Sequence, residues 1–346
     1  MATNSDNKIN IGDAWKGISS IQINIGDTWK DVSEGYINIG DSWKQFWTAA
    51  ATLGDRGVII GGNTTASVNI MDYITISTTG DATDFGDTTV LTRGCAAFSN
   101  GGSGRGIAAG GYSTTYLNVI QYITVSTPSD ATDFGDCIGT KYLPGGGSNG
   151  TNDRGLFAGG KNNNLGIDYI TISTTSNSAD FGDLTIARLY MTGRSNTTNE
   201  RIVWMGGFLS SYLDVIDYAT MNSTSNATDF GNTIVNIATM SSASNGVNER
   251  GLGMGGTESG TTTRRIEYVT INSTGNAADF GDLIKGMVSS AGTDNKENER
   301  AVNCGGKYDG VMDNTCEYLT MSSLGGGTVF GDLTIARSDF DGLSNA

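Results

Sequence analysis

Short apolar runs alternate with turns rich in Gly, Asn, Ser and Thr along most of this chain. The runs are rich in β-branched residues, as in DYITIST (72–78) and QYITVST (121–127). No segment places its apolar residues at the 3.6-residue spacing of an amphipathic helix, whereas short β-branched runs bounded by turn residues are typical of strands. The pattern therefore predicts an all-β protein built from short strands.

The larger part of the chain consists of six repeated units. Each unit opens with an Arg and a short apolar run that ends in Gly-Gly, such as RGVIIGG (56–62). A Tyr follows in a second run, and a Phe-Gly pair comes after it. The repeated positions are Arg56, Arg105, Arg154, Arg201, Arg250 and Arg300, then Tyr73, Tyr122, Tyr169, Tyr218, Tyr268 and Tyr318, then Phe85, Phe134, Phe181, Phe230, Phe280 and Phe330.

Each unit holds four strand-like runs: the Arg run, the Tyr run, a run after Phe-Gly, and a weaker run before the next Arg. The Arg residues are 47 to 50 residues apart, and four short strands in such a repeat are typical of a β-propeller blade. We therefore predict a six-bladed propeller over residues 49–346. Residues 338–345 resemble the last run of a unit, so we expect them to complete the first blade. The segment 47–55 competes for that place.

A second repeat system occupies the N-terminus. The sequences INIGDAWK, INIGDTWK and INIGDSWK begin at Ile9, Ile23 and Ile37, and Gly-Asp between two short runs favours a hairpin turn. Isolated hairpins are marginally stable, so the three must pack on each other or on a partner. Residues 1–48 are thus predicted to be either a self-contained sheet or a docking module, whose docking residues would be Trp15, Trp29 and Trp43.

Composition and charge exclude several classes of partner and of catalytic site. The 346 residues include 51 Gly and no His, and the net charge is −15. An acidic chain is repelled by phosphate backbones and anionic lipids, so we expect neither nucleic acid nor a membrane as partner. The lack of His excludes Ser-His-Asp catalysis and imidazole-bound metals. The four Cys have no CxxC spacing, which predicts small buried thiols.

The order Gly-Gly, Tyr, aromatic residue, Arg resembles kelch repeats, with Phe85 and its equivalents in place of the usual kelch Trp. The whole pattern, with units such as IDYITIST (167–174) and ADFGDLTIAR (179–188) and the INIGDxWK hairpins, is similar to kelch-like virion proteins of tailed bacteriophages of the marine and cyanophage type. This resemblance implies a non-enzymatic virion protein, present in multiple copies, that binds other virion proteins through its N-terminal repeats. The absence of a signal-like segment fits synthesis in the host cytoplasm.

Several motifs imitate catalytic sites. Asp-Phe-Gly occurs five times, at 84, 133, 180, 229 and 279, but its blade-length spacing and the missing His argue against a kinase. We interpret it as the turn between the second and third runs, with Asp capping backbone amides. No cofactor or metal is expected: galactose oxidase, the enzyme precedent among kelch-like propellers, needs two His for copper. Ca²⁺ at turns such as Asp84/Asp87 remains a weaker alternative to solvated turns.

Recognition is expected in the six segments that follow Gly-Gly, which differ in every unit. We call residues 63–71, 112–120, 161–167, 208–216, 257–266 and 307–316 the variable loops. They carry aromatic residues that we expect to be exposed and to bind a host glycan or protein, as aromatic rings with polar tips can. These candidate ligand-binding residues are Tyr112, Tyr116, Phe208, Tyr212 and Tyr308. Drift in unconstrained surface loops is the competing interpretation.

The function predicted from these observations is host attachment by a propeller on a tail, fibre or baseplate appendage. The first alternative is a capsid or neck decoration protein with a structural role only. The second alternative is a glycan hydrolase that uses paired carboxylates such as Asp72 and Asp217. It ranks last because these Asp recur beside the Tyr in several units.

Overall fold

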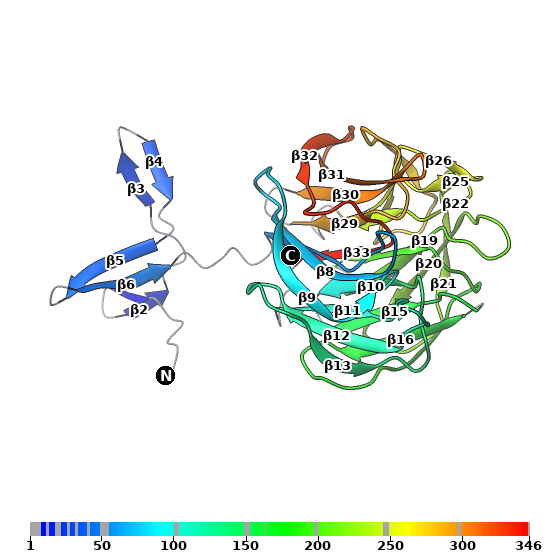
Figure 1. Cartoon of the computed structure of the whole chain (residues 1–346), viewed down its shortest axis with the longest axis horizontal. Coiled ribbons are helices and arrows are strands. Elements are labelled where there is room, and N and C mark those ends of the chain that lie inside the picture. Colours follow the sequence, from blue (N-terminus) through cyan, green and yellow to red (C-terminus); the bar gives the residue numbers. More distant parts are fainter. Residues whose placement is uncertain are drawn as a thin grey trace. The chain divides into compact units, whose positions relative to one another are not determined.

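The computed structural model gives strands between residues 8 and 48 and describes residues 55–344 except 100–103, 149–152, 163, 197–199, 245–248 and 296–298. Every regular element of these residues is a β-strand (Figure 1). The chain divides into two units, Met1–Leu53 and Gly54–Ala346.

The first unit contains three antiparallel strand pairs. β1 (Lys8–Ile11) pairs with β2 (Ala14–Gly17), β3 (Gln22–Ile25) with β4 (Thr28–Asp31), and β5 (Glu34–Ile39) with β6 (Ser42–Thr48). Trp15, Trp29 and Trp43 lie opposite Asn10, Asn24 and Asn38. This is the pairing that the sequence predicts; the Gly-Asp turns and the Trp side chains lie outside the described residues.

The second unit is built from four-stranded antiparallel sheets. We number them along the chain: sheet 1 is β33-β7-β8-β9, sheet 2 is β10-β11-β12-β13, sheet 3 is β14-β15-β16-β17, sheet 4 is β18-β19-β20-β21, sheet 5 is β23-β24-β27-β28 and sheet 6 is β29-β30-β31-β32. β22 (Ile237–Ala238), β25 (Thr257–Glu258) and β26 (Thr261–Thr262) form a small additional sheet.

The strands occupy equivalent places in these sheets. The first strands are β33 (Asp341–Ser344), β10 (Ala96–Ser99), β14 (Gly145–Ser148), β18 (Thr192–Ser195), β23 (Ser241–Ala243) and β29 (Ala291–Asp294). The second strands, which begin at the repeated Arg, are β7 (Arg56–Ile60), β11 (Arg105–Ala109), β15 (Arg154–Ala158), β19 (Arg201–Met205), β24 (Arg250–Met254) and β30 (Arg300–Tyr308).

The third strands carry the repeated Tyr, and the fourth carry Phe-Gly. The third strands are β8 (Val68–Thr75), β12 (Val119–Thr124), β16 (Gly166–Thr171), β20 (Val215–Thr220), β27 (Arg265–Thr270) and β31 (Val311–Thr320). The fourth strands are β9 (Thr83–Thr92), β13 (Thr132–Asp136), β17 (Ala179–Asp183), β21 (Thr228–Asn232), β28 (Ala278–Asp282) and β32 (Thr328–Asp332).

The first strands contact one another in a closed cycle, from β33 through β10, β14, β18, β23 and β29 back to β33. A cycle of hydrogen bonds runs alongside. Each member donates its N–H to the carbonyl of its equivalent in the preceding sheet, and Gly94 closes the cycle by donating to Asp339. The members are Gly94, Leu143, Tyr190, Thr239, Ser289 and Asp339, all with positive φ. The fold is therefore β-propeller-like.

Sheet 1 contains both ends of this unit. The C-terminal strand β33 pairs antiparallel with β7, with Leu343 opposite Val58, and Figure 1 shows red β33 beside the blue strands of the first sheet. This is the place that the sequence predicts for the C-terminal tail. The competing segment 47–55 lies outside the described residues apart from strand β6 and Asp55.

The hydrophobic core lies between neighbouring sheets. In the layer between sheets 1 and 2, Val58 and Phe85 of sheet 1 pack with Ala97 and Ile123 of sheet 2. Equivalent layers separate the other pairs of neighbouring sheets. Burial of apolar area at these seams is the main source of stability expected for such a fold.

The repeated Arg, Tyr and Phe form one stack per sheet. In sheet 3 the Arg154 guanidinium lies 4.8 Å from the centre of the Tyr169 ring, whose edge meets Phe181 at 6.0 Å between ring centres. Arg154 also donates a hydrogen bond of 3.0 Å to the Met221 carbonyl of sheet 4. The equivalent Arg of the other sheets do the same to the next sheet. The Arg residues therefore join sheets, which explains their regular spacing.

The interpretation of Asp-Phe-Gly as a turn is wrong. Phe85 is the extra residue of a β-bulge inside β9, because Asp72 pairs with Asp84 and Met71 with Gly86. The side chain that caps an amide comes instead from the turn of the next sheet: Asp130 accepts a hydrogen bond of 3.0 Å from the Asp87 N–H. A Cβ on Gly86, where φ is +134°, would lie 2.6 Å from the Ser129 carbonyl of that turn. Gly is needed because the two sheets approach so closely.

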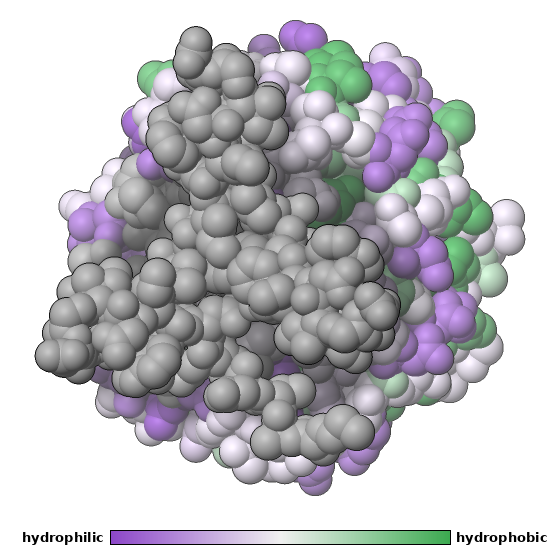
Figure 2. All heavy atoms as spheres, turned by 90° about the vertical axis from the view of Figure 1, so that its left-hand side faces the viewer, coloured by the Kyte–Doolittle hydropathy of each residue, from purple (hydrophilic) through white to green (hydrophobic). Residues whose placement is uncertain are grey.

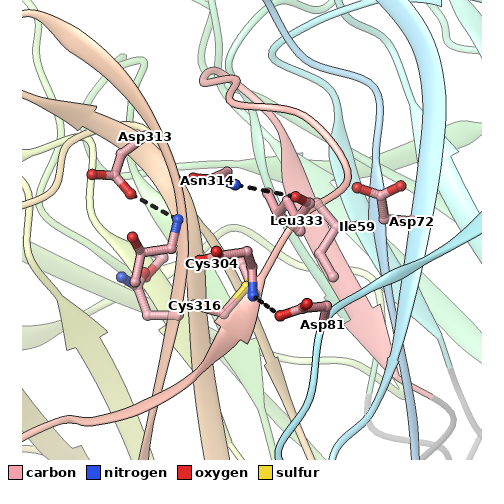
Figure 3. The surroundings of a disulfide bond; sticks show 12 residues. Ile59, Asp72, Asp81, Cys304, Asp313, Asn314, Cys316 and Leu333 are labelled. Atoms are coloured by element: carbon pink, nitrogen blue, oxygen red, sulfur yellow. Dashed lines mark hydrogen bonds between the residues drawn. A yellow bond between two sulfur atoms is a disulfide. The ribbon is translucent and has the colours of Figure 1, made fainter.

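The prediction of four free thiols is also wrong for two of them. Cys304 of β30 and Cys316 of β31 are directly opposite each other and form a disulfide, buried with Ile59 and Leu333 (Figure 3). Cys95 and Cys137 are buried free thiols, and burial raises the pKa of each to about 12. The same two positions are paired in the other sheets, for example Ile60 with Met71.

Candidate functional site

The variable loops begin where the second strand of each sheet ends. Gly61 and Gly62 both have positive φ, and the Gly62 N–H donates a hydrogen bond of 2.8 Å to the Thr92 carbonyl. The other Gly-Gly pairs repeat this arrangement. The chain thus leaves every sheet in the same direction, and the loops emerge at the end of the strands opposite to Arg56 and its equivalents.

Tyr112 and Tyr116 of the second variable loop form a cluster with Tyr142, which the sequence did not single out. Their ring centres lie 5.5, 5.5 and 5.7 Å apart. The Arg93 guanidinium covers the Tyr112 ring at 4.8 Å and donates a hydrogen bond of 2.8 Å to the Asn63 side chain. Tyr116 is 37% exposed and Tyr112 is half-buried. The cluster therefore presents Tyr116 on a packed base.

Phe208 and Tyr212 form a second aromatic pair in the fourth variable loop. Their ring centres lie 5.3 Å apart, and the two residues form a β-bridge. Both are half-buried. The expectation of freely exposed rings is therefore wrong for Tyr112, Phe208 and Tyr212, because the loop residues pack on each other and on the segment that precedes the first strand.

Tyr308 stands apart from these groups. It lies at the end of β30 opposite Val311 of β31, and the two side chains are 44% and 70% exposed. These two residues form an exposed apolar tip on sheet 6. The five aromatic candidates thus fall into three separate places.

Tyr190 lies near members of both aromatic groups. Burial raises its pKa to about 12, and Tyr142, Asp339, Arg93 and Tyr212 also act on it. Burial likewise raises the pKa of Tyr142, with Asp339 as the next cause. Tyr142 and Tyr190 precede the first strands of sheets 3 and 4, outside the variable loops. An alignment of the repeats could have revealed Tyr142 and Tyr190, because the equivalent residues of the other repeats are not aromatic.

Among the described residues, the space enclosed by the first strands has no cavity large enough for a large ligand. A cavity of about 60 Å³ lies at the Tyr190 end, enough for roughly two waters and well below the several hundred Å³ usual for a ligand pocket. Arg194 of β18 crosses the enclosed space and donates hydrogen bonds of 2.9 Å to the Ser242 and Gly292 carbonyls of sheets 5 and 6. Binding of a large ligand therefore has to use the outer surface.

The exposed surface offers further apolar residues at separate points. Ile138, Ile234 and Ile284 are 62%, 40% and 44% exposed, each shortly after a Phe-Gly pair. Where described residues are visible in Figure 2, hydrophobic residues are interspersed with hydrophilic ones. Single exposed apolar residues are ordinary on protein surfaces, so they do not outweigh the tyrosine clusters as a candidate site.

Asp72 and Asp217, the carboxylates of the hydrolase alternative, have structural partners. Each is fully buried and forms an ion pair of 2.7 Å, Asp72 with Arg337 and Asp217 with Arg188. They belong to sheets 1 and 4, so they do not form a pair with each other. A catalytic carboxylate must touch the substrate, and these contacts leave neither side chain free to do so.

The structure gives no evidence for a Ca²⁺ site at Asp84 and Asp87. Asp84 and Asp87 are exposed, and within the described ranges no three acidic or Cys side chains gather as metal ligands.

In the described part of the chain, no helix is long and apolar enough to cross a lipid bilayer.

Comparisons with known proteins bring no further assignment. No protein-family model matches this chain, and no curated protein matches it. The candidate site therefore rests on its own geometry.

Proposed function

We propose that this protein is a six-bladed, kelch-like β-propeller of a tailed-phage virion, and that its variable loops attach the particle to its host. In this proposal the protein is not an enzyme and belongs to a tail, fibre or baseplate appendage. The observation that carries the proposal is the cluster of Tyr112, Tyr116 and Tyr142 among loops that differ in every sheet, while the Arg, Tyr, Phe and Gly positions that join the sheets repeat.

Six blades are supported by the closed cycle of backbone hydrogen bonds from Gly94 to Asp339. Each member belongs to a different four-stranded sheet or immediately precedes one. The kelch-like character is supported by the Gly-Gly pairs and by the stacked Arg, Tyr and Phe of each sheet.

Host attachment is supported by where the chain enters the second unit. It enters sheet 1 at Arg56, whereas the first variable loop begins beyond Ile60, at the other end of the same strand. Docking of residues 1–48 on other virion proteins, through Trp15, Trp29 and Trp43, would thus tether the propeller at the end opposite to its loops.

The ligand class that best fits the loops is a host glycan or a protein that carries one. Tyrosine rings offer an apolar face and a polar hydroxyl, and the Arg93, Asn63 and Asp339 side chains near the cluster offer hydrogen-bonding groups. A shallow platform of this kind needs no deep pocket.

The decoration protein remains the second candidate, and one observation favours it. Three of the five loop aromatics are half-buried and packed on neighbours, as expected if these rings only stabilise the loops.

Adsorption of particles that carry Tyr116→Ala tests the proposal. Weaker adsorption with normal particle yield supports host attachment. The matched control is Leu324→Ala, which removes a 59% exposed apolar side chain from the turn after β31, at the end of the sheet away from the loops. Normal adsorption of Tyr116→Ala, Tyr212→Ala and Tyr308→Ala particles would overturn host attachment and favour decoration.

A further inference from the structure

One side chain fastens each sheet to the preceding one by accepting a hydrogen bond. The residue before the repeated Tyr always supplies this acceptor, and a backbone N–H shortly after the Phe-Gly pair of the preceding sheet donates. The acceptors are Asp72, Gln121, Asp168, Asp217, Glu267 and Glu317, and the donors, in the same order, are Thr334, Thr89, Ile138, Thr185, Ile234 and Ile284, at 2.7 to 3.2 Å.

In four of the six sheets, the charge of this acceptor is matched by the residue seven positions after Phe in the preceding sheet. Three Asp acceptors meet a buried cation: Asp72 meets Arg337, Asp168 meets Lys141 and Asp217 meets Arg188. The uncharged Gln121 corresponds to Thr92. The two Glu acceptors depart from the rule, since Ile237 and Met287 occupy the cation position for Glu267 and Glu317.

Glu267 is the less compensated of these two. It is fully buried; its Oε2 accepts from the Ile234 N–H at 2.9 Å, and its Oε1 has no hydrogen-bond partner. Glu317 is buried too, but Lys285 acts favourably on it and a second backbone N–H, that of Lys285, donates to it. A buried carboxylate without a cation is costly.

The other groups around Glu267 do not replace the missing cation. The preceding connection, residues 233–238, contributes no titratable side chain. On β24 the residue opposite is Gly253, and on β28 it is the exposed Asp279. Arg265 of β27 is the one cation that acts on Glu267, and it is 3.5 Å from Glu258 of β25, which acts in the opposite sense.

We propose that the seam between sheets 4 and 5 is a pH-sensitive joint, closed while Glu267 carries a proton and loosened when Glu267 ionises. The ionised form needs water or a cation that the closed seam does not provide, so ionisation favours an open seam in which water reaches the carboxylate. The seam between sheets 3 and 4 lacks this response because Arg188 already neutralises Asp217.

The direction of the effect follows from proton linkage. Burial raises the pKa of Glu267 from 4.5 to about 7 in the closed state, and the open state has the ordinary value. The stabilisation by the protonated form is complete below about pH 4.5 and is lost as pH rises through 7. The equilibrium constant for opening of the seam should therefore increase roughly tenfold per pH unit between about pH 5 and pH 7, and it should level off above pH 7.

Hydrogen exchange of the Ile234 amide tests the proposal on the full chain. The rate in the wild type is divided by the rate in Glu267→Gln at the same pH, which cancels the intrinsic pH dependence of exchange. Gln keeps an acceptor for Ile234 and carries no charge, as Gln121 does in sheet 2. We expect the ratio to rise by one to two orders of magnitude between pH 5 and pH 8.

The Thr185 amide, which donates to Asp217, is the internal control and should show no such rise. Asp279→Asn is the matched variant, because it removes an exposed carboxylate opposite Glu267 and should behave like the wild type. If Glu267→Gln does not fold, Ile237→Arg provides the second test: a cation at the place of Arg188 should abolish the pH dependence at Ile234. A ratio that stays constant from pH 5 to 8, or a Glu267 carboxyl that titrates below pH 5 by NMR, would overturn the proposal.

Discussion

Asp72 and Arg337 lie 265 residues apart in the sequence, yet the Arg337 guanidinium donates a hydrogen bond of 2.7 Å to the Asp72 carboxylate. Arg337 also donates to the Gly61 carbonyl at 2.9 Å. Both charged side chains are fully buried. The pair therefore fastens the connection after sheet 6 to sheet 1, beside the backbone pairing of β33 with β7.

Asp72→Asn should destabilise the protein strongly. It leaves the Arg337 charge buried without its counter-charge, which typically costs about 3–5 kcal/mol in the free energy of unfolding. Urea unfolding measures the loss. Asp84→Asn, an exposed change on β9, is the control and should cost little. The double variant Asp72→Gln with Arg337→Thr copies Gln121 and Thr92 and should recover most of the stability; a double variant as unstable as Asp72→Asn would contradict this account.

Gly86→Ala should also be destabilising, although it adds one methyl group. The Cβ would lie 2.6 Å from the Ser129 carbonyl, and φ at this residue is +134°. We expect a loss of more than about 1 kcal/mol in thermal or urea unfolding. Gly139→Ala is the matched control, since a Cβ there meets nothing within 4 Å. Equal stability of the two variants would show that the bulge tolerates a side chain.

The disulfide predicts a dependence on reductant. Cys304 and Cys316 are separated by 12 residues, and closing a loop of this length stabilises a fold by roughly 3 kcal/mol in the chain-entropy model. Urea unfolding should therefore shift when a reductant is added to the wild type. The variant Cys304→Ala with Cys316→Ile, which copies Ala109 and Ile120 of sheet 2, should not respond. A wild type that unfolds identically with and without reductant would argue against the bond.

The loop aromatics should separate into two classes. Tyr116→Ala should weaken host adsorption and leave the melting temperature nearly unchanged, because the ring lies on top of its cluster. Tyr112→Ala should lower stability as well, by about 2 kcal/mol, because Arg93 and Tyr142 lose a packing partner. Differential scanning calorimetry and an adsorption assay on the same variants check this. Equal stability of both variants would contradict the packed base.

Deletion of residues 1–48 tests the docking role proposed for Trp15, Trp29 and Trp43. We expect the remaining chain to fold, since its sheets close on themselves, and to be missing from purified particles. Circular dichroism and mass spectrometry of particles are the measurements. Normal incorporation of the shortened chain would assign docking to another surface.

The repeats made the strand order and the C-terminal closure predictable. Each unit has four strand-like runs, but the run at residues 338–345 is followed by no further unit. It therefore fits beside the run that begins at Arg56, as the missing strand of the first sheet. The disulfide was predictable in principle, because Cys304 and Cys316 occupy the two positions that pair in every sheet. The spacing of the Cys residues alone does not reveal the pair, because the pairing depends on the register of the repeat.

Other features depend on neighbours that sequence spacing does not reveal. The bulge at Phe85 follows from the approach of the next sheet's turn at Ser129. The packing of Tyr112 depends on Tyr142, which lies at the far end of the same repeat, just before the first strand of the next sheet. The mismatch of Glu267 becomes visible only when Ile237 is recognised as the residue at the position that Arg188 and Arg337 hold toward Asp217 and Asp72.

The closure of sheet 1 has a mechanical consequence. β7, the strand through which the chain enters the second unit, is hydrogen-bonded on both sides, to β33 and to β8. A pull on the chain ahead of Arg56 along the strand axis would load both rows of hydrogen bonds together, in shear rather than one after another. Tension transmitted from the first unit would therefore be resisted by both neighbours of β7 at once, and the C-terminal strand β33 would carry part of that load.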